Sequence, residues 1–327
     1  MSTSMQAMSR SANFVKAVTH GLTLALAAIM FVANARVFSV YPFMFWVIVL
    51  LIWGALWQYN QTLSGVAYRS TAARRFQAFF VPFVFGITLL WLWEAITIGL
   101  KVPTVLMPAP SLIAGKVVTS LPTLAADFVQ TVLRAAIPGW LMGCMAGFLV
   151  ALICDRFDFL RRGLLPIGNF VSALPIIGIA PILVMWFGFD WQSKAAVVVV
   201  MTFFPMLVNT IAGLASAGAL ERDLMRSYGA SWFQTLVSLR LPAAMPFIFN
   251  ALKINATLAM IGALVAEFFG SPTVGMGFRI STDIGRMALD MVWATIVVAA
   301  IAGSAFYGVL VLAERAVTFW HPSYRQR

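Results

Sequence analysis

The sequence predicts an all-α, polytopic membrane helix bundle, and composition, hydropathy and the lengths of its apolar runs support this fold class. Hydrophobic residues make up 61% of the 327 residues and charged residues 10%, and the mean hydropathy is +0.92. These values lie well outside the balance of a soluble domain. Because the backbone must satisfy its own hydrogen bonds in lipid, the spanning segments are expected to be helices.

Eight apolar runs are long enough for a bilayer core about 30 Å thick, which needs roughly 20 residues per helix. They lie near residues 14–34, 40–57, 79–99, 132–153, 164–187, 195–214, 247–269 and 291–313. We expect the first two to form an N-terminal transmembrane hairpin, followed by a basic cytosolic linker, in a domain of residues 1–77. The other six are expected to form a six-helix core in a second domain, residues 78–327.

The basic residues orient this bundle with its N-terminus in the cytosol, because cytosolic segments of membrane proteins are enriched in Lys and Arg. Fourteen basic residues then lie inside: Arg10, Lys16, Arg69, Arg74, Arg75, Arg156, Arg161, Arg162, Arg222, Arg226, Arg240, Arg315, Arg325 and Arg327. Six lie outside: Arg36, Lys101, Lys116, Lys194, Arg279 and Arg286. The net charge of +11 therefore indicates topology control and contact with anionic lipid, and not nucleic-acid binding.

The first apolar run allows two interpretations. Arg10 and Lys16 precede an apolar stretch that ends at Ala33-Asn34-Ala35, which also fits a cleavable signal covering residues 1–35. We favour a retained span, with both termini in the cytosol. Cleavage would leave the orientation of the later spans unchanged.

A polar stretch at residues 220–242, between two apolar runs, predicts an exposed helical pair on the cytosolic side. Its first helix has an apolar arc interrupted by Glu221, opposite Arg222, Asp223 and Arg226; the arc consists of Leu220, Leu224, Met225 and Tyr228. This pattern favours a helix offered to a partner protein, and the alternative is a helix that lies on the membrane surface.

The residues that follow predict a turn and a second helix. Gly229 suits the left-handed residue that ends a helix. Ser231 and Gln234 have the spacing of a capping box that starts the next helix. Pro242 is expected to stop it.

The run from Leu174 to Gly188 predicts an interrupted helix. Pro175 and Pro181 each remove a backbone donor, and Gly178 lies between them. Irregular backbone at membrane depth is tolerated where it lines a cavity, and transport sites are often built from broken helices. We therefore place part of a translocation pathway at these three residues; the alternative is a simple proline kink.

Four charged residues lie inside predicted spans, where an ionised group tends to face a cavity or a partner: Glu94, Arg134, Lys253 and Glu267. We expect structural pairing near the outer ends for Glu94, Arg134 and Glu267, and snorkelling for Lys253. Glu94 and Glu267 are also candidates for the pathway, or for proton coupling in an ion-coupled secondary transporter. The charged outer loops are candidates for docking an external protein.

Enzymatic chemistry finds little support. His20 and His321 lie at opposite ends of the chain, and Cys144 and Cys154 lack the close spacing of a zinc site. A nucleotide-binding loop of the Gly-x4-Gly-Lys-Ser/Thr type is absent from the sequence. We expect no catalytic residues, metal or cofactor, and a driving force that comes from another protein.

The 220–242 segment resembles the cytoplasmic loop of ABC importer permeases. Gly229, Leu239, Leu241 and Pro242 keep its spacing, while Asp223-Leu224-Met225 stands where that family has Glu-Ala-Ala. The likeness extends from about residue 78 to the C-terminus. It includes Leu92-Trp93-Glu94, Met107 to Ser111 and Leu174 to Gly188, and Gly275-Met276-Gly277 replaces the more frequent Gly-Leu-Gly.

These motifs are similar to the subfamily that serves nitrate, sulfonates, taurine, thiamine-precursor pyrimidines and riboflavin. The resemblance implies an inner-membrane permease subunit that pairs with a copy of itself. It also implies a cytosolic ABC ATPase dimer and a periplasmic or extracellular substrate-binding protein as partners. The ATPase would contact the 220–242 segment through Leu220, Asp223, Leu224, Met225, Tyr228, Gly229, Leu239, Leu241 and Pro242.

Overall fold

The computed structural model describes residues 21, 23–34, 40–65, 71–172, 175–270 and 273–319, without the side chains of residues 71–73, 158, 169 and 172. All regular structure in these ranges is helical, which confirms the predicted all-α class. The chain divides into two compact units, Met1–Lys116 and Val117–Arg327. Each unit is described by itself. Of residues 1–35, which form either a retained span or a cleavable signal, only residues 21 and 23–34 are described, and both histidines lie outside the described residues.

The first unit is built on two long antiparallel helices, α3 (Pro42–Gly65) and α4 (Thr71–Gly99), followed by α5 (Pro110–Thr119). Phe45 of α3 is buried beside Trp91 and Ala95 of α4. A side chain at Gly99 would come within 2.3 Å of the Phe45 ring, so the glycine permits this close approach. Both helices occupy part of the stretch before residue 77, where a basic linker was expected, since α3 ends at Gly65 and α4 begins at Thr71. The domain boundary near residue 77 stays a prediction.

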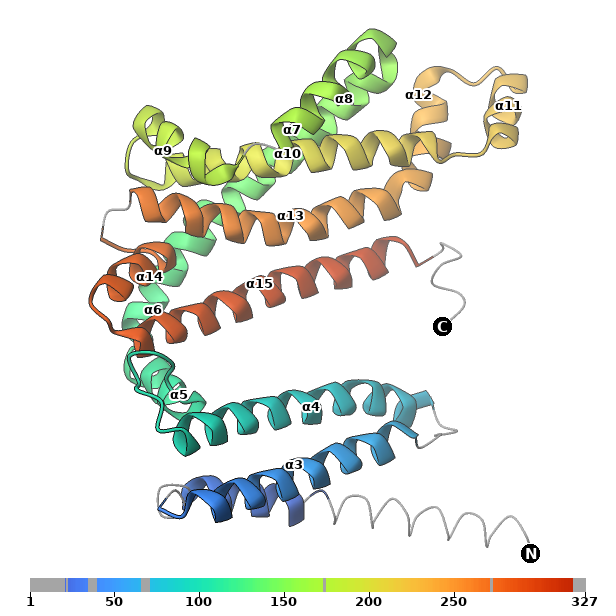
Figure 1. Cartoon of the computed structure of the whole chain (residues 1–327). Helices are drawn as coiled ribbons and strands as arrows, with labels where there is room; N and C mark the ends of the chain where they lie inside the picture. The colour runs from blue at the N-terminus through green and yellow to red at the C-terminus, as the bar shows by residue number, and fades with distance from the viewer. Residues whose placement is uncertain are drawn as a thin grey trace, which may run out of the picture. The chain divides into compact units, whose positions relative to one another are not determined.

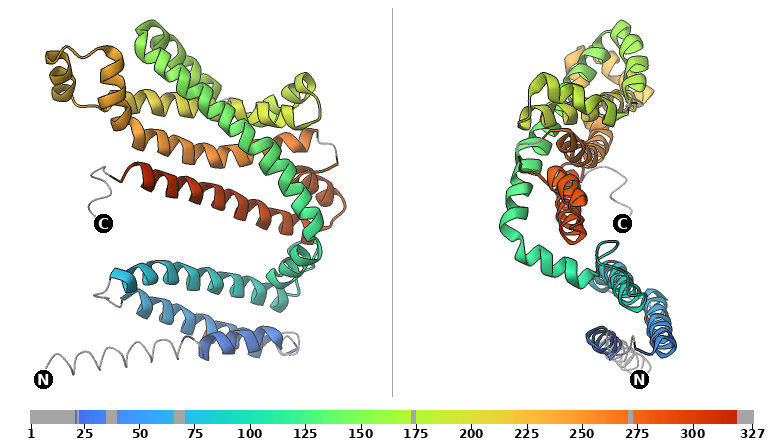
Figure 2. Two further views of the ribbon diagram at one scale, coloured as in Figure 1. Left: turned by 180° about the vertical axis from the view of Figure 1, so that it is seen from behind. Right: turned by 60° about the vertical axis from the view of Figure 1, so that its left-hand side comes forward.

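The second unit contains the remaining helices. In chain order they are α6 (Leu121–Phe128), the π-helix η1 (Val129–Ala136), α7 (Ile137–Arg156), α8 (Asp158–Ser172), α9 (Ile176–Phe187), α10 (Trp191–Ala215), α11 (Ala219–Ser227), α12 (Trp232–Thr235), the π-helix η2 (Leu236–Arg240), α13 (Leu241–Phe269), α14 (Met276–Gly285) and α15 (Leu289–Val317). Helix α10 lies between α7 and α13, and α7 crosses them at a slant (Figures 1 and 2).

Small residues bring α7 and α10 together. Gly139, Gly143 and Gly147 recur every fourth residue on α7 and are buried. A Cβ atom at Gly143 would lie 2.0 Å from the Thr202 hydroxyl of α10, and one at Gly147 would lie 2.4 Å from the carbonyl oxygen of Phe203. Membrane helices pack closely through such small residues, because lipid supplies no hydrophobic force to hold them together.

Six described helical stretches are long and apolar enough to cross a membrane: Pro42–Gly65, Arg74–Gly99, Leu121–Arg156, Trp191–Ala215, Trp232–Phe269 and Leu289–Val317. Two of the eight predicted runs are not among them. Only residue 21 and residues 23–34 of the first run are described, and the run at 164–187 forms two shorter helices, α8 and α9. Within the predicted interruption from Leu174 to Gly188, Ile176–Phe187 forms one helix, α9, that continues through Pro181, so the expected break at Pro181 is wrong.

Candidate functional site

The 220–242 loop projects beyond the ends of α10 and α13, at what we call the loop end of the second unit (Figure 1). Its first helix, α11, ends at a glycine turn. Gly229 adopts φ of 69°, and Ala230 donates a hydrogen bond to the carbonyl of Met225 over 3.0 Å. Such a left-handed position favours glycine, which has no Cβ to clash with the backbone.

The second helix of the loop begins with the predicted capping box. The Ser231 hydroxyl accepts a hydrogen bond from the Gln234 backbone, and the Gln234 side chain accepts one from the Ser231 backbone. The predicted stop at Pro242 is wrong. The chain passes from η2 directly into α13, and Pro242 lies in its first turn. The helical stretch Trp232–Phe269 therefore continues through this proline.

The apolar side chains of α11 have almost no cover from the chain itself. Leu220 is 85% exposed, Leu224 56% and Tyr228 80%. Met225 is half-buried and Asp223 is exposed. Exposed apolar residues grouped on one helix indicate a contact surface.

By contrast, Leu239, Leu241 and Pro242 are half-buried where η2 meets α13. They lie where the loop joins the bundle. The predicted contact residues therefore divide into an exposed group on α11 and a structural group at the start of α13.

Arg240 holds this junction in place. Its guanidinium donates to both carboxylate oxygens of Asp155 on α7, over 2.7 and 2.5 Å, and its Nε donates to the carbonyl of Leu214 on α10 over 3.1 Å. A two-pronged Arg–carboxylate contact fixes direction as well as distance. The loop is therefore clamped to two helices, α7 and α10. From the sequence, Arg240 is recognised only as one of the basic residues assigned to the cytosolic side, because no local spacing connects it with Asp155.

At the opposite end of the second unit, which we call the far end, a buried polar cluster surrounds the start of α14. Three successive backbone N–H groups donate to three side chains: Gly275 to Asp127 (2.8 Å), Met276 to Thr131 (2.8 Å) and Gly277 to Glu267 (2.7 Å). The Thr131 hydroxyl in turn lies 2.8 Å from a Glu267 carboxylate oxygen, to which it donates. These contacts tie α14 to α6, η1 and α13.

The far-end cluster is tightly fitted. Asp127 and Thr131 are fully buried and Glu267 is 2% exposed. Arg279 neutralises Asp127 through an Nε–Oδ2 contact of 2.8 Å, and this hydrogen bond raises the pKa of Arg279 above its ordinary value. Arg279 therefore stays charged at any working pH.

The charged residues predicted inside spans have found partners of several kinds. Glu94 accepts hydrogen bonds from the backbone and hydroxyl of Ser111, at 2.9 and 2.6 Å, within the first unit. Lys253, expected to snorkel, pairs with Glu314 at 2.7 Å. An ion pair between Glu267 and Arg134 is not formed in the described part of the chain, because Glu267 is held by Thr131 and Gly277.

The predicted pathway segment starts at Pro175, whose extended backbone (φ −67°, ψ 115°) precedes α9. Pro181 lies inside α9 and does not end it. A Cβ at Gly178 would meet no neighbour within 4 Å, so this glycine has open space on one side. A pathway at these residues stays a prediction.

A multi-pass helical bundle with an exposed apolar helix at one end fits a membrane subunit that contacts another protein. The chain belongs to the family of binding-protein-dependent transport system inner membrane components, whose family model matches residues 139–319.

Several proteins similar to this chain are also named as transport permeases. The chain is 30% identical to a probable ABC transporter permease protein of Haemophilus influenzae, over 64% of this chain and 85% of the relative. It is 31% identical to the formylaminopyrimidine transport permease protein ThiX of Halalkalibacterium halodurans, over 60% and 78%. It is 27% identical to the riboflavin transport system permease protein RibX of Chloroflexus aurantiacus, over 72% and 88%.

The chain is thus a multi-pass ABC importer permease subunit, a transport component and not an enzyme. Family membership implies an ATPase and a substrate-binding protein as partners. It disfavours the ion-coupled secondary transporter that was considered as an alternative for Glu94 and Glu267.

Proposed function

We propose that the 220–242 loop is the docking site for a cytosolic ABC ATPase, and that the loop end of the bundle faces the cytosol. The observation that carries this proposal is the combination of an exposed apolar helix, α11, with the Arg240 clamp behind it. An exposed apolar surface supplies binding energy for a partner. A clamp to α7 and α10 lets movement of that partner reach the bundle and not only the loop.

Helix α13 offers a route for that movement. It runs without interruption from Leu241, next to the Arg240 clamp, to Phe269, next to Glu267 of the far-end cluster. At 1.5 Å per residue its 29 residues span roughly 44 Å. We propose that ATP-driven closure of the ATPase dimer tilts α13 and shifts α14 at the other face.

The permease is proposed to work as a homodimer in the cytoplasmic (inner) membrane, each copy contacting one ATPase subunit. Its solute is proposed to be small: a pyrimidine or riboflavin-like heteroaromatic compound, or a sulfonate, taurine or nitrate. The support for this range is the printed names of the relatives, which include formylaminopyrimidine, riboflavin, aliphatic sulfonates and taurine.

Co-purification tests the docking proposal. The full chain is expressed with its ATPase, and Tyr228→Asp is compared with Ile284→Asp, which changes an exposed apolar residue of α14 at the far end (54% exposed). We expect Tyr228→Asp to release the ATPase and Ile284→Asp to retain it. A double variant, Tyr228→Asp with Gly229→Pro, that still retains the ATPase would overturn the proposal.

A labelling experiment tests the orientation. A membrane-impermeant thiol reagent is applied to intact cells and to inverted vesicles that carry Tyr228→Cys. The parent chain is a suitable background because Cys144 and Cys154 are both buried. Labelling is expected only in inverted vesicles; labelling in intact cells would place the loop outside.

A further inference from the structure

Arg134 differs from seven other charged groups in the helical spans of the second unit. Asp127, Glu267, Lys253, Glu314, Asp155 and Arg240 all have charged, hydroxyl or backbone partners, and Lys194 donates to the carbonyl of Phe189. Arg134 is exposed, and its one hydrogen bond within the described residues is a long contact of 3.4 Å to the Gln130 amide oxygen. An arginine without an anionic partner inside a membrane segment points to a function.

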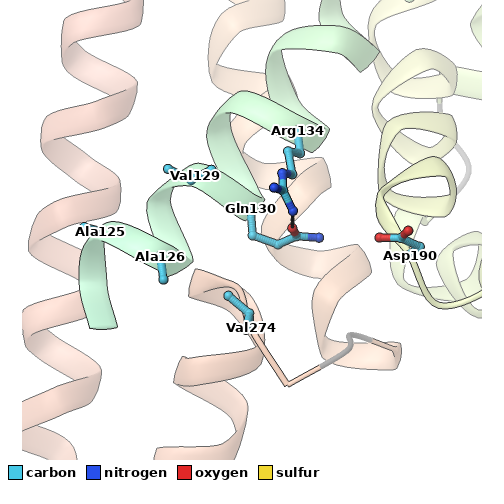
Figure 3. A pocket seen from close by; sticks show the side chains of 7 residues that line it. All are labelled: Ala125, Ala126, Val129, Gln130, Arg134, Asp190 and Val274. Atoms are coloured by element: carbon cyan, nitrogen blue, oxygen red, sulfur yellow. Dashed lines mark hydrogen bonds between the residues drawn. The ribbon is translucent and has the colours of Figure 1, made fainter. Parts of the chain in front are cut away.

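Arg134 lines a pocket of about 500 Å³ at the far end, which Figure 3 shows from close by. Gln130 and Arg134 come from η1, Asp190 from the residue before α10, and Val274 from the loop before α14. The walls between them are small and apolar: Ala125, Ala126 and Val129. The volume falls in the range of small-molecule sites.

The π-helix η1 contributes both to the far-end cluster and to the wall of the pocket. A π-helix carries more residues per turn than an α-helix, and such turns are frequent at functional sites. Thr131 is fully buried and contacts Glu267. Its neighbour Gln130 and the residue one turn on, Arg134, line the pocket. The cluster that fixes α14 thereby also fixes the pocket wall at Val274.

The charges of the pocket define a ligand class. Arg134 offers planar N–H donors that suit a sulfonate, carboxylate or phosphate, and the Gln130 side chain adds amide groups. Asp190 lies on the opposite side (Figure 3), where its carboxylate caps α10 by accepting from the Trp191 backbone at 2.8 Å. Arg134 and Asp190 do not form an ion pair with each other. Asp190 therefore repels a second anionic group and attracts a donor or a cation.

We propose that this pocket binds the transported solute as it enters, and that the solute is a small molecule with one anionic oxygen group and a donor or ammonium group at its other end. Arg134 and Gln130 hold the anionic group, and Asp190 receives the donor. This inference rests on the proposed transport function and narrows its substrate class. The same anion chemistry is found in a lipid phosphate, so the test separates the two sources.

The test uses Ala126→Cys, an exposed wall position of the pocket, in the full chain in lipid nanodiscs. The rates of modification by anionic sulfonatoethyl and cationic trimethylammonioethyl methanethiosulfonate are compared by intact-mass spectrometry. We expect the anionic reagent to be favoured, and Arg134→Gln to lower the ratio of anionic to cationic rates about ten-fold. Arg286→Gln is the matched control. It removes an exposed arginine (side chain 69% exposed) at the same end but outside the pocket, and should leave the ratio nearly unchanged.

Ligand protection then identifies the class. Taurine, the probe with one sulfonate and one ammonium group, is expected to slow modification more than ethane-1,2-disulfonate does. Asp190→Asn should remove that preference, and Arg134→Gln should abolish protection by both. Equal protection by the two probes in the parent would overturn the role of Asp190, and protection that survives Arg134→Gln would overturn the site.

A change of lipid tests whether a lipid phosphate occupies the pocket instead. In that case, nanodiscs with anionic phosphatidylglycerol will show a lower modification rate than nanodiscs with phosphatidylcholine, and taurine will not protect. This result would overturn the solute proposal.

Co-purification of Arg134→Gln with the ATPase is measured in parallel. Since Arg134 lies at the far end, retention of the ATPase with loss of protection assigns the defect to the pocket. Loss of the ATPase from the parent chain would instead count against the docking proposal.

Discussion

Replacing Thr131 with valine removes a single hydroxyl from the far-end cluster while keeping the size and shape of the side chain. That hydroxyl accepts from the Met276 backbone at 2.8 Å and donates to Glu267 at 2.8 Å. Both contacts are fully buried, so water does not replace them. The first turn of α14 should therefore open more often.

The free-energy cost of Thr131→Val follows from the two contacts that are lost. A buried backbone donor left without its acceptor costs about 1–3 kcal/mol, and loss of a hydrogen bond to a charged group costs about 1.5–3 kcal/mol. Since the contacts of Gly275 and Gly277 remain and neighbouring effects are not additive, we expect a total of about 2–4 kcal/mol. Each 1.4 kcal/mol is ten-fold in an equilibrium, so local opening should increase by at least roughly 30-fold.

Hydrogen–deuterium exchange measures this opening. The peptide covering residues 274–285 is followed by mass spectrometry, with the full chain in nanodiscs. Thr210→Val is the matched control, because Thr210 is also fully buried and its hydroxyl has no partner among the described residues. Thr131→Val should speed exchange in this peptide, and Thr210→Val should not. If both variants exchange at the parental rate, the three side chains do not hold α14.

Two other substitutions test the packing at the far end and at the loop end. Gly277→Ala would put a Cβ atom 2.2 Å from the carbonyl oxygen of Leu264, whereas a Cβ at Gly285 would meet nothing within 4 Å. In thermal unfolding we expect Gly277→Ala to lower the free energy of unfolding by about 1–3 kcal/mol, and Gly285→Ala to change it little. Arg240→Ala leaves a largely buried Asp155 carboxylate without its cation, which typically costs about 3–5 kcal/mol; we expect a lower unfolding temperature and, in the assembled transporter, ATP hydrolysis that no longer drives uptake. Transport that stays coupled in this variant would contradict the role of the Arg240 clamp.

Much of the loop could be predicted because its signals are local. The apolar arc of α11, the left-handed glycine at Gly229 and the capping box of Ser231 and Gln234 each depend on residues within a turn or two. The stop at Pro242 could not be decided in this way, because a proline ends some helices and is tolerated inside others. The preceding π-helix, which feeds directly into α13, decided between the two.

The sequence by itself determined that this chain is a bundle of membrane helices and that a short amphipathic helix followed by a glycine turn lies between two of them, at residues 220–229. Hydrophobicity, proline and helical periodicity act over short distances and can be read along the chain. Only the tertiary structure decided which charges meet. Arg240 joins Asp155 across 85 positions, and Thr131 joins Glu267 across 136. Side chains so far apart are brought together by helix packing, and no local pattern encodes the distance between them. For the same reason, only the folded bundle distinguishes Arg134, the arginine at the pocket, from charges that are already paired.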